Sequence, residues 1–160
     1  METKKINFGC GKDIKKGFLN VDYPEINLNK PLHYQDNEFD YGLCKSVIPY
    51  LKNLHFSLKE MKRICKKLEV AFPHFSVGTP NQISYGKVYY LGFSINNMFL
   101  LKPDEIIVKN SFFKIKLKKK NWKGKLMIYF EQYLSAIIKI REMYLIWNKK
   151  SNNSQEKTGS

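Results

Sequence analysis

Residues 6–22, which read INFGCGKDIKKGFLNVD, combine a glycine turn with a lone carboxylate in a layout that suits a nucleotide-like ligand. Two short apolar stretches frame the turn, and the second of them ends at Asp22. Gly9 and Gly11 let the backbone turn sharply and approach a ligand without an intervening Cβ. A carboxylate at the tip of the next strand can accept hydrogen bonds from both hydroxyls of a ribose. The pattern predicts a site for a free ribose diol, and a plain tight turn is the alternative.

The turn departs from the dinucleotide-binding fingerprint in two respects. Lys12 follows Gly11, so the third glycine of the fingerprint is absent. Asp22 lies only 11 positions beyond Gly11, whereas a dinucleotide fold usually has about 20 residues between the turn and the acid. The glycine pair alone is therefore a weak signal, and the following elements have to supply its context.

The residues after Asp22 predict a strand, a helix and a second strand. Alternating residue types over 39–44 indicate a buried strand. Ser57 and Glu60 form a capping box, which predicts a helix from Ser57 to about Lys67. Residues 68–72 then form a short strand candidate.

In this order the motifs resemble class I S-adenosylmethionine-dependent methyltransferases, in particular small members with a shortened first helix. The matching segments lie between Ile6 and His74 and read INFGCG, GFLNVD, NLNKPL, DNEFDY, LKEMKRICKK and VAFPH. The resemblance implies an α/β fold with a Rossmann-like, mostly parallel sheet, an antiparallel edge hairpin and trimmed helices. It also implies S-adenosylmethionine as cofactor and methyl transfer to an acceptor that the sequence does not identify.

The resemblance assigns a role to each matching residue. Gly9, Cys10 and Gly11 would pass beside the methionine end of the cofactor, Asp22 would hold the ribose, Tyr23 would flank the adenine, and Asn27 and Leu28 would lie on the adenine-binding segment. Asp40 would open a strand whose far end, around Cys44 and Lys45, faces the transferred methyl group. His74 is the first candidate for a general base and Tyr50 the second. A turn or capping role for Asp40 and an ordinary loop position for His74 are the alternatives.

Three segments depart from the family pattern. Asn27 replaces a carboxylate, which adds hydrogen-bond donors to a group that otherwise only accepts. Residues 48–50, Ile-Pro-Tyr, replace Leu-Glu-His, and residues 66–68 replace a Lys-Pro-Gly-Gly turn, so the helix must pass directly into the strand. These losses leave a second hypothesis open, in which the chain is a catalytically degenerate subunit of this fold that supports a partner.

Length and composition predict one compact domain over residues 1–148 and a disordered tail over residues 149–160. A chain of 160 residues that is 43% hydrophobic has ample material for one core. Three scattered cysteines form neither a disulfide framework nor a CxxC zinc pair, which favours a reducing cytoplasmic location. The N-terminus does not resemble a signal peptide, and no run of about 18 uncharged apolar residues is present.

The second half of the chain matches the family pattern less well. The resemblance implies that residues 75–103, rich in Gly, Asn, Ser and aromatic residues, form a lid over the substrate, in which Tyr85, Tyr89 and Tyr90 either line an acceptor pocket or pack in the core. Residues 105–118 predict a hairpin near the sheet edge. Apolar residues that step by three and four predict a helix over 126–148, which docks on the sheet or forms a homodimer contact.

The formal net charge of +14 is concentrated in the last third of the chain. Lysines crowd the segment from Lys114 to Lys125, with Trp122 among them. Lysines interleaved with an aromatic residue suit phosphate contacts and base stacking, so a nucleic-acid-binding module is a further hypothesis. A lysine-rich composition without function explains the segment equally well.

Overall fold

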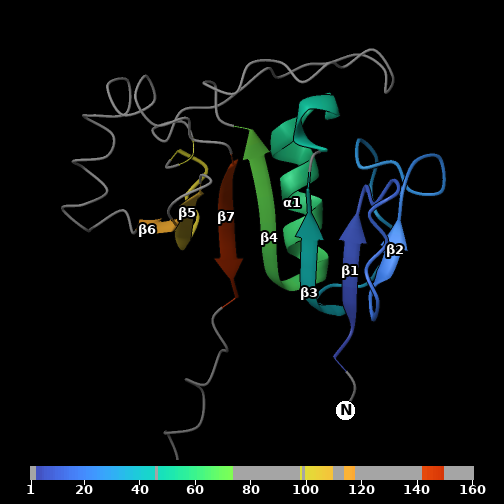
Figure 1. Ribbon diagram of the computed structural model, residues 1–160. Helices are drawn as coiled ribbons and strands as arrows, with labels where there is room; N and C mark the ends of the chain where they lie inside the picture. Colours follow the sequence, from blue (N-terminus) through green and yellow to red (C-terminus); the bar gives the residue numbers. More distant parts are fainter. Residues whose placement is uncertain are drawn as a thin grey trace, which may run out of the picture.

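Within the described part of the chain, seven strands form a single sheet, and the helix α1 lies on it (Figure 1). The computed structural model describes residues 3–45, 47–73, 98, 100–109, 114–117 and 142–149. In chain order the elements are β1 (Lys5–Phe8), β2 (Leu19–Val21), β3 (Phe39–Cys44), the 3-10 helix η1 (Ile48–Tyr50), α1 (Leu54–Ile64), β4 (Cys65–Pro73), β5 (Glu105–Lys109), β6 (Lys114–Leu117) and β7 (Glu142–Asn148).

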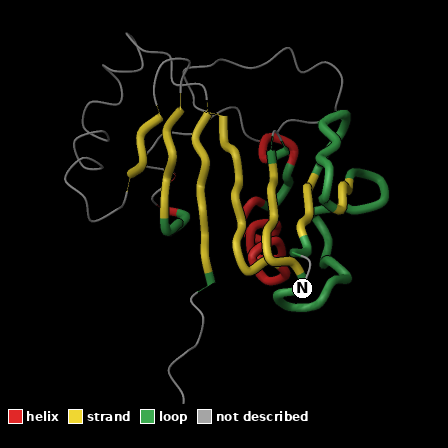
Figure 2. Tube along the Cα trace, turned by 60° about the horizontal axis from the view of Figure 1, so that its bottom comes forward, coloured by secondary structure: helices red, strands yellow, loops and turns green. Residues whose placement is uncertain are grey.

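The sheet has a parallel half and an antiparallel half, which lie side by side in the order β2-β1-β3-β4-β7-β5-β6 (Figure 2). β1 to β4 pair in parallel, β7 runs antiparallel to β4, and β5 runs antiparallel to β7. β5 therefore points the same way as β1 to β4, and five of the seven described strands share one direction. β5 and β6 form an antiparallel hairpin at the sheet edge. The predicted Rossmann-like sheet with an edge hairpin is confirmed.

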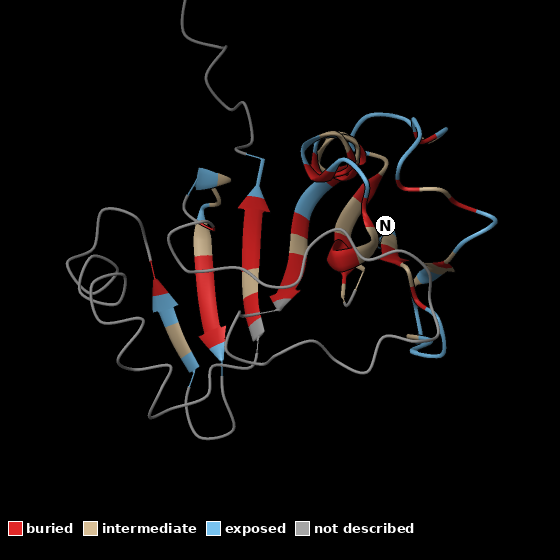
Figure 3. Cartoon of the chain, turned by 90° about the horizontal axis from the view of Figure 1, so that it is seen from above, coloured by how far each residue is buried: buried red, intermediate tan, exposed pale blue. Residues whose placement is uncertain are grey.

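The helix α1 packs on one face of the sheet and shares its core (Figures 1 and 3). Leu58, Met61 and Ile64 of α1 are buried in one cluster with Phe8 and Leu68 of the strands. No helix lies between β1 and β2, so the first helix, which was expected to be short, is absent. None of the described helices is long and apolar enough to cross a membrane.

The helix boundaries correct the capping-box prediction. α1 begins at Leu54, and the side chain of Asn53 accepts a hydrogen bond from the Phe56 N–H at 3.1 Å, so Asn53 is the N-cap. Ser57 lies inside the helix, where its hydroxyl donates to the Leu28 carbonyl at 2.7 Å. α1 ends at Ile64 and β4 starts at Cys65, so the helix does pass directly into the strand, as the missing glycine turn required.

The predicted helix over 126–148 is wrong for its last seven residues, which form the strand β7. β7 pairs with β4 on one side and with β5 on the other, and Leu145 is opposite both Val70 and Ile106. Leu145, Ile146 and Trp147 are all buried, so both faces of the strand are covered and no polar alternation marks it. This segment belongs to the chain's own sheet and supplies no helical dimer contact.

Several predictions concern residues outside the described part of the chain. These are His74, the tyrosines at 85, 89 and 90, the helix over 126–141, the lysines from 118 to 125 and the tail from 150. Within the described part, Lys114 and Lys116 are exposed on β6 and Leu117 is buried, in agreement with the predicted basic and apolar faces of the hairpin.

Candidate functional site

The glycine turn after β1 has the backbone conformation that its sequence predicted. Gly9 and Gly11 have φ values of +62° and +47°, in the left-handed region that glycine tolerates best. A Cβ at Gly9 would lie 2.1 Å from Cγ2 of Val47, so any side chain there collides with the segment that follows β3. The turn therefore requires glycine at position 9 for space as well as for conformation.

Asp22 lies at the tip of β2 and holds this turn. Its Oδ2 accepts a hydrogen bond from the Gly11 N–H at 2.8 Å, and its Oδ1 accepts from the Tyr23 N–H at 2.9 Å. The Cys10 N–H donates to the Val21 carbonyl at 3.1 Å. Each carboxylate oxygen has more than one acceptor position, so Asp22 keeps capacity for ligand hydroxyls.

The side chains of two asparagines hold the loop between β1 and β2, where no helix is present. The buried Asn7 donates from Nδ2 to the Asp13 carbonyl at 2.9 Å and to Asn20 Oδ1 at 3.0 Å. The Asn20 amide donates to the Lys15 and Phe18 carbonyls and accepts from the Lys15 N–H. This amide pair fixes the loop 12–18 without helical hydrogen bonds. The sequence analysis missed it, although two asparagines inside apolar strands are an available signal.

A cleft of about 1130 Å³ opens at the carboxyl ends of β1, β2 and β3, where open α/β sheets bind ligands. Eight residues predicted to bind cofactor line it: Gly9, Cys10, Gly11, Asp22, Tyr23, Asn27, Leu28 and Lys45. Tyr50, the second candidate for a general base, lines it as well. The structure thus brings together one site from four separate segments of the sequence.

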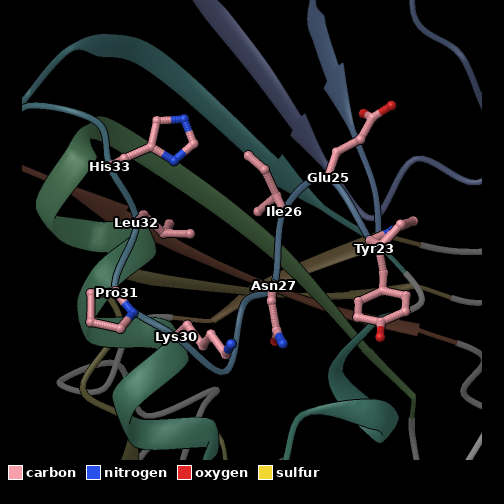
Figure 4. A pocket seen from close by; sticks show the side chains of 9 residues that line it. Tyr23, Glu25, Ile26, Asn27, Lys30, Pro31, Leu32 and His33 are labelled. Atoms are coloured by element: carbon pink, nitrogen blue, oxygen red, sulfur yellow. The ribbon is translucent and has the colours of Figure 1, made fainter.

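The segment 26–29 forms a wall of this cleft and is anchored to the start of α1. The Leu28 carbonyl accepts from Ser57, and Asn29 Oδ1 accepts from the Lys52 N–H at 2.6 Å. Asn27 Oδ1 accepts from the Asn29 N–H at 3.0 Å, so its NH2 group is the donor that a carboxylate would lack. Figure 4 views a second, smaller pocket of about 360 Å³ that shares Tyr23, Ile26 and Asn27 with the cleft, and in it Asn27 and Tyr23 point to one side of the chain and Glu25 to the other.

No protein-family model and no curated protein sequence matches the chain. Solved structures do match over nearly its whole length. An S-adenosylmethionine-dependent methyltransferase from Thermotoga maritima aligns with a TM-score of 0.56 at 13% identity, over 94% of this chain and 84% of that one. A chain of the complex between the Haloferax volcanii Trm112 methyltransferase activator and its methyltransferase aligns with a TM-score of 0.57 at 9% identity, over 94% and 84%.

The chain has the fold of class I S-adenosylmethionine-dependent methyltransferases. An S-adenosylmethionine-dependent methyltransferase from Methanosarcina mazei agrees, with a TM-score of 0.50 at 10% identity over 94% of this chain and 95% of that one. The chain therefore spans most of the length of these three methyltransferase-fold structures.

Two residues that the resemblance assigned to the cofactor, Asp40 and Cys44, do not line the cleft of this methyltransferase fold. Asp40 lies at the start of β3, at the far end of the strand from the cleft, where it accepts from Lys66 Nζ at 2.7 Å and from the Lys4 N–H at 3.0 Å. The hydrogen bond from Lys66 holds the pKa of Asp40 below its ordinary value. Asp40 therefore ties β3 to its neighbours at the end of the strand opposite the cleft, and it neither forms a turn nor caps a helix.

The cysteines of the methyltransferase fold are buried thiols. Cys44 is fully buried at the end of β3, and burial raises its pKa to about 12. Cys10 lines the cleft, and burial also raises its pKa. Since the thiolate is the nucleophilic form, neither side chain is suited to attack a substrate.

Of the two candidate general bases, the structure describes Tyr50 and does not describe His74. Tyr50 is the last residue of η1, whose three residues stand where the family pattern has Leu-Glu-His. Ile48 and Pro49 of η1 are buried. His74 directly follows Pro73, the last residue of β4, and lies outside the described residues. No group of three or more metal-binding side chains occurs within the described ranges.

Proposed function

We propose that the protein is an S-adenosylmethionine-dependent methyltransferase. The observation that carries this proposal is the hydrogen bond of 2.8 Å from the Gly11 N–H to the Asp22 carboxylate. This bond joins the carboxylate that would bind the ribose to the glycine turn at the cleft. The methyltransferase fold of the chain supports the same activity. The acceptor of the methyl group is not specified by these observations.

The resemblance gives each of the cleft residues a part in holding the cofactor. Asp22 would accept hydrogen bonds from the ribose hydroxyls, and Asn27 and Leu28 would meet the adenine. Tyr23, whose side chain is 74% exposed, would close over the adenine from outside. Gly9 to Gly11 would pass beside the methionine end.

S-adenosylmethionine, when bound, supplies an electrophilic methyl group on a sulfonium. The protein then has mainly to align an acceptor with that methyl and exclude water. A general base is needed only for an acceptor that is poorly ionised, and His74 is the first candidate, with Tyr50 second. The His74→Ala variant should lose most turnover but keep cofactor affinity, and equal turnover would exclude His74 from the mechanism.

A catalytically degenerate subunit is the second candidate, since Pro49, which is buried, and Tyr50 stand where the family pattern of the resemblance has Glu and His. Such a subunit would bind cofactor weakly or not at all and transfer no methyl group. For either function we propose a cytoplasmic location, supported by three free buried cysteines.

Calorimetric titration with S-adenosylmethionine and S-adenosylhomocysteine tests the proposed function. We compare wild-type protein with Asp22→Asn and with Asp13→Asn, which removes the same charge from the same cleft. Micromolar binding that is lost in Asp22→Asn and kept in Asp13→Asn supports the cofactor site. Absence of binding to the wild-type protein refutes the proposal and leaves the degenerate subunit.

A further inference from the structure

A second hollow, which we call the α1 groove, lies apart from the cleft. Its volume is about 460 Å³, and it is formed by one face of α1, by residues 100–102 before β5 and by Trp147 of β7. His55, Lys59 and Lys62 of α1 line it, and their spacing of four and three residues puts them on one helix face. No described residue lines both the groove and the cleft. The proposed function therefore gives the groove no role.

The wall of the α1 groove that faces the helix is fixed to the sheet. The indole N–H of Trp147 donates to the Lys102 carbonyl at 3.1 Å and to the Leu101 carbonyl at 3.4 Å. The Asp104 N–H donates to the Ile146 carbonyl at 2.9 Å. The loop is thus held to β7 at two points. A wall that is already ordered lowers the entropy cost of binding a partner.

The described lining of the α1 groove carries positive charge and no carboxylate. Its cationic side chains are Lys59, Lys62, Lys102 and Arg63. Lys59 and Lys102 are exposed, one on α1 and the other on the opposite wall. Two separated ammonium groups therefore face solvent on the two sides of the groove.

Carboxylates beside the α1 groove offset only part of this charge. Glu60 and Asp36 form ion pairs with Arg63 at 3.1 Å and 2.8 Å. Lys149 Nζ donates to the Arg63 carbonyl at 2.9 Å, so these two acids are matched by two cations. Asp104 accepts from the Asn148 N–H at 2.6 Å and does not line the groove. Even with Asp104 counted against them, the three lysines of the lining leave a positive excess.

The α1 groove also offers apolar surface. Leu100 is 70% exposed, and Leu101 beside it is partly buried. Trp147 is only 7% exposed, and Lys62 Nζ lies 5.3 Å from the centre of its ring. The indole therefore leaves little surface on which a nucleic-acid base could stack. An apolar side chain, by contrast, can pack on the exposed Leu100.

We propose that the α1 groove binds an acidic segment of a partner protein. Carboxylates of this segment pair with Lys59 and Lys102 on the two walls, and an apolar side chain between them packs on Leu100. Positive charge on the groove and negative charge on the segment speed association and select the partner. The inference concerns a surface outside the cleft and does not depend on the proposed function.

Four fluorescein-labelled probes test which ligand the groove takes. They are a short peptide of Glu and Leu, the same peptide with Gln in place of Glu, the same peptide with Ser in place of Leu, and a single-stranded oligouridylate of equal charge. Fluorescence anisotropy should show the Glu–Leu peptide binding at least about fivefold more tightly than each of the others. Binding of the oligouridylate as tightly as this peptide would overturn the proposal in favour of nucleic acid. Failure of the Glu–Leu peptide to bind would also overturn it.

A double variant tests the lysines. Lys59→Met with Lys102→Met should weaken the Glu–Leu peptide about fivefold, because two ion pairs at exposed positions are lost. Lys16→Met with Lys114→Met is the matched control, since it removes two exposed lysines that do not line the groove. The control should stay within about twofold of wild type. Equal losses in the two double variants would show that binding follows net charge, and would overturn the proposal.

A second pair of variants tests the apolar contact. Leu100→Ser should weaken the Glu–Leu peptide about fivefold and leave the Ser-containing peptide unchanged, because only the first has an apolar side chain to pack. Ile14→Ser is the control, since Ile14 is 65% exposed and does not line the groove. An unchanged affinity in Leu100→Ser would contradict the proposed contact.

Discussion

The parallel half of the sheet carries the cleft, whereas the antiparallel half carries an apolar core. Asn7 of β1 is buried in a hydrogen-bonded amide pair, and Asp22 at the end of β2 is tied to the glycine turn. In β7, by contrast, Met143 and Leu145 are fully buried among apolar neighbours. The comparison teaches that hydrogen-bonded polar groups gather beside the cleft, where the proposed cofactor would bind, while the strand β7 of the other half adds apolar side chains to the core. Each prediction below tests this division.

Trp147→Ala should have the largest effect, and on stability alone. The indole is 7% exposed, and its N–H donates to the Lys102 carbonyl at 3.1 Å. Truncation should cost about 3–5 kcal/mol of unfolding free energy, measured by urea denaturation. Trp147→Phe, the matched control, should cost less because most of the ring is retained. The affinity of the folded protein for S-adenosylhomocysteine should not change, and a large loss of affinity would show that the two halves are coupled.

Gly9→Ala should weaken ligand binding and stability together. The alanine has to adopt φ +62° and displace Val47, whereas Gly17→Ala meets φ +78° with no atom within 4 Å. The conformational cost of about 1–2 kcal/mol is common to both variants. Only Gly9→Ala should also lose affinity for S-adenosylhomocysteine, measured by calorimetry. Equal affinities in the two alanine variants would mean that the turn does not meet the ligand.

These two regions also differ in how well the sequence predicted them. Around the turn, residue type is tied to a physical requirement, since Gly9 has no room for a Cβ and Asp22 lies where a strand ends. Eight of the cofactor residues inferred there line one cleft. β7 offered only apolar spacing, and a strand buried on both faces has the same composition as a buried helix. The partner strands that decide between them, β4 and β5, are distant in sequence.

The capping-box prediction was wrong for a related reason. The Glu60 side chain binds the backbone of a loop that is distant in sequence, and it does not cap the N-terminus of α1. Glu60 Oε2 accepts from the Leu32 N–H at 3.0 Å and from Arg63 at 3.1 Å. Arg63 in turn donates to the Leu32 and Tyr34 carbonyls. The pair therefore anchors the loop after the cleft wall to α1, which no local pattern could reveal.

Glu60→Gln should reduce stability in a pH-dependent way. Hydrogen bonds from Arg63 hold the pKa of Glu60 below its ordinary value of 4.5. A carboxylate with a depressed pKa stabilises the fold above pH 4.5, and this contribution disappears as the pH falls through the lower folded-state pKa. We expect a loss of about 1 kcal/mol at pH 7 and a smaller loss at pH 3, from urea denaturation at both values. Glu38→Gln, which removes the same charge from the same loop, is the control and should cost less at pH 7.

Asp40→Asn should have the smallest effect on stability and on ligand affinity. It compares two carboxylates within the parallel half of the sheet. Asp40 and Asp22 are both carboxylates of this half, but only Asp22 lines the cleft, and Asp40 pairs with the exposed Lys66 at the opposite end of β3. A surface ion pair of this kind contributes little to stability, because solvent screens the charges. Calorimetry should therefore find the affinity for S-adenosylhomocysteine unchanged in Asp40→Asn and strongly reduced in Asp22→Asn. A comparable loss in both variants would show that affinity follows the net charge of the sheet and not the contacts at its carboxyl edge.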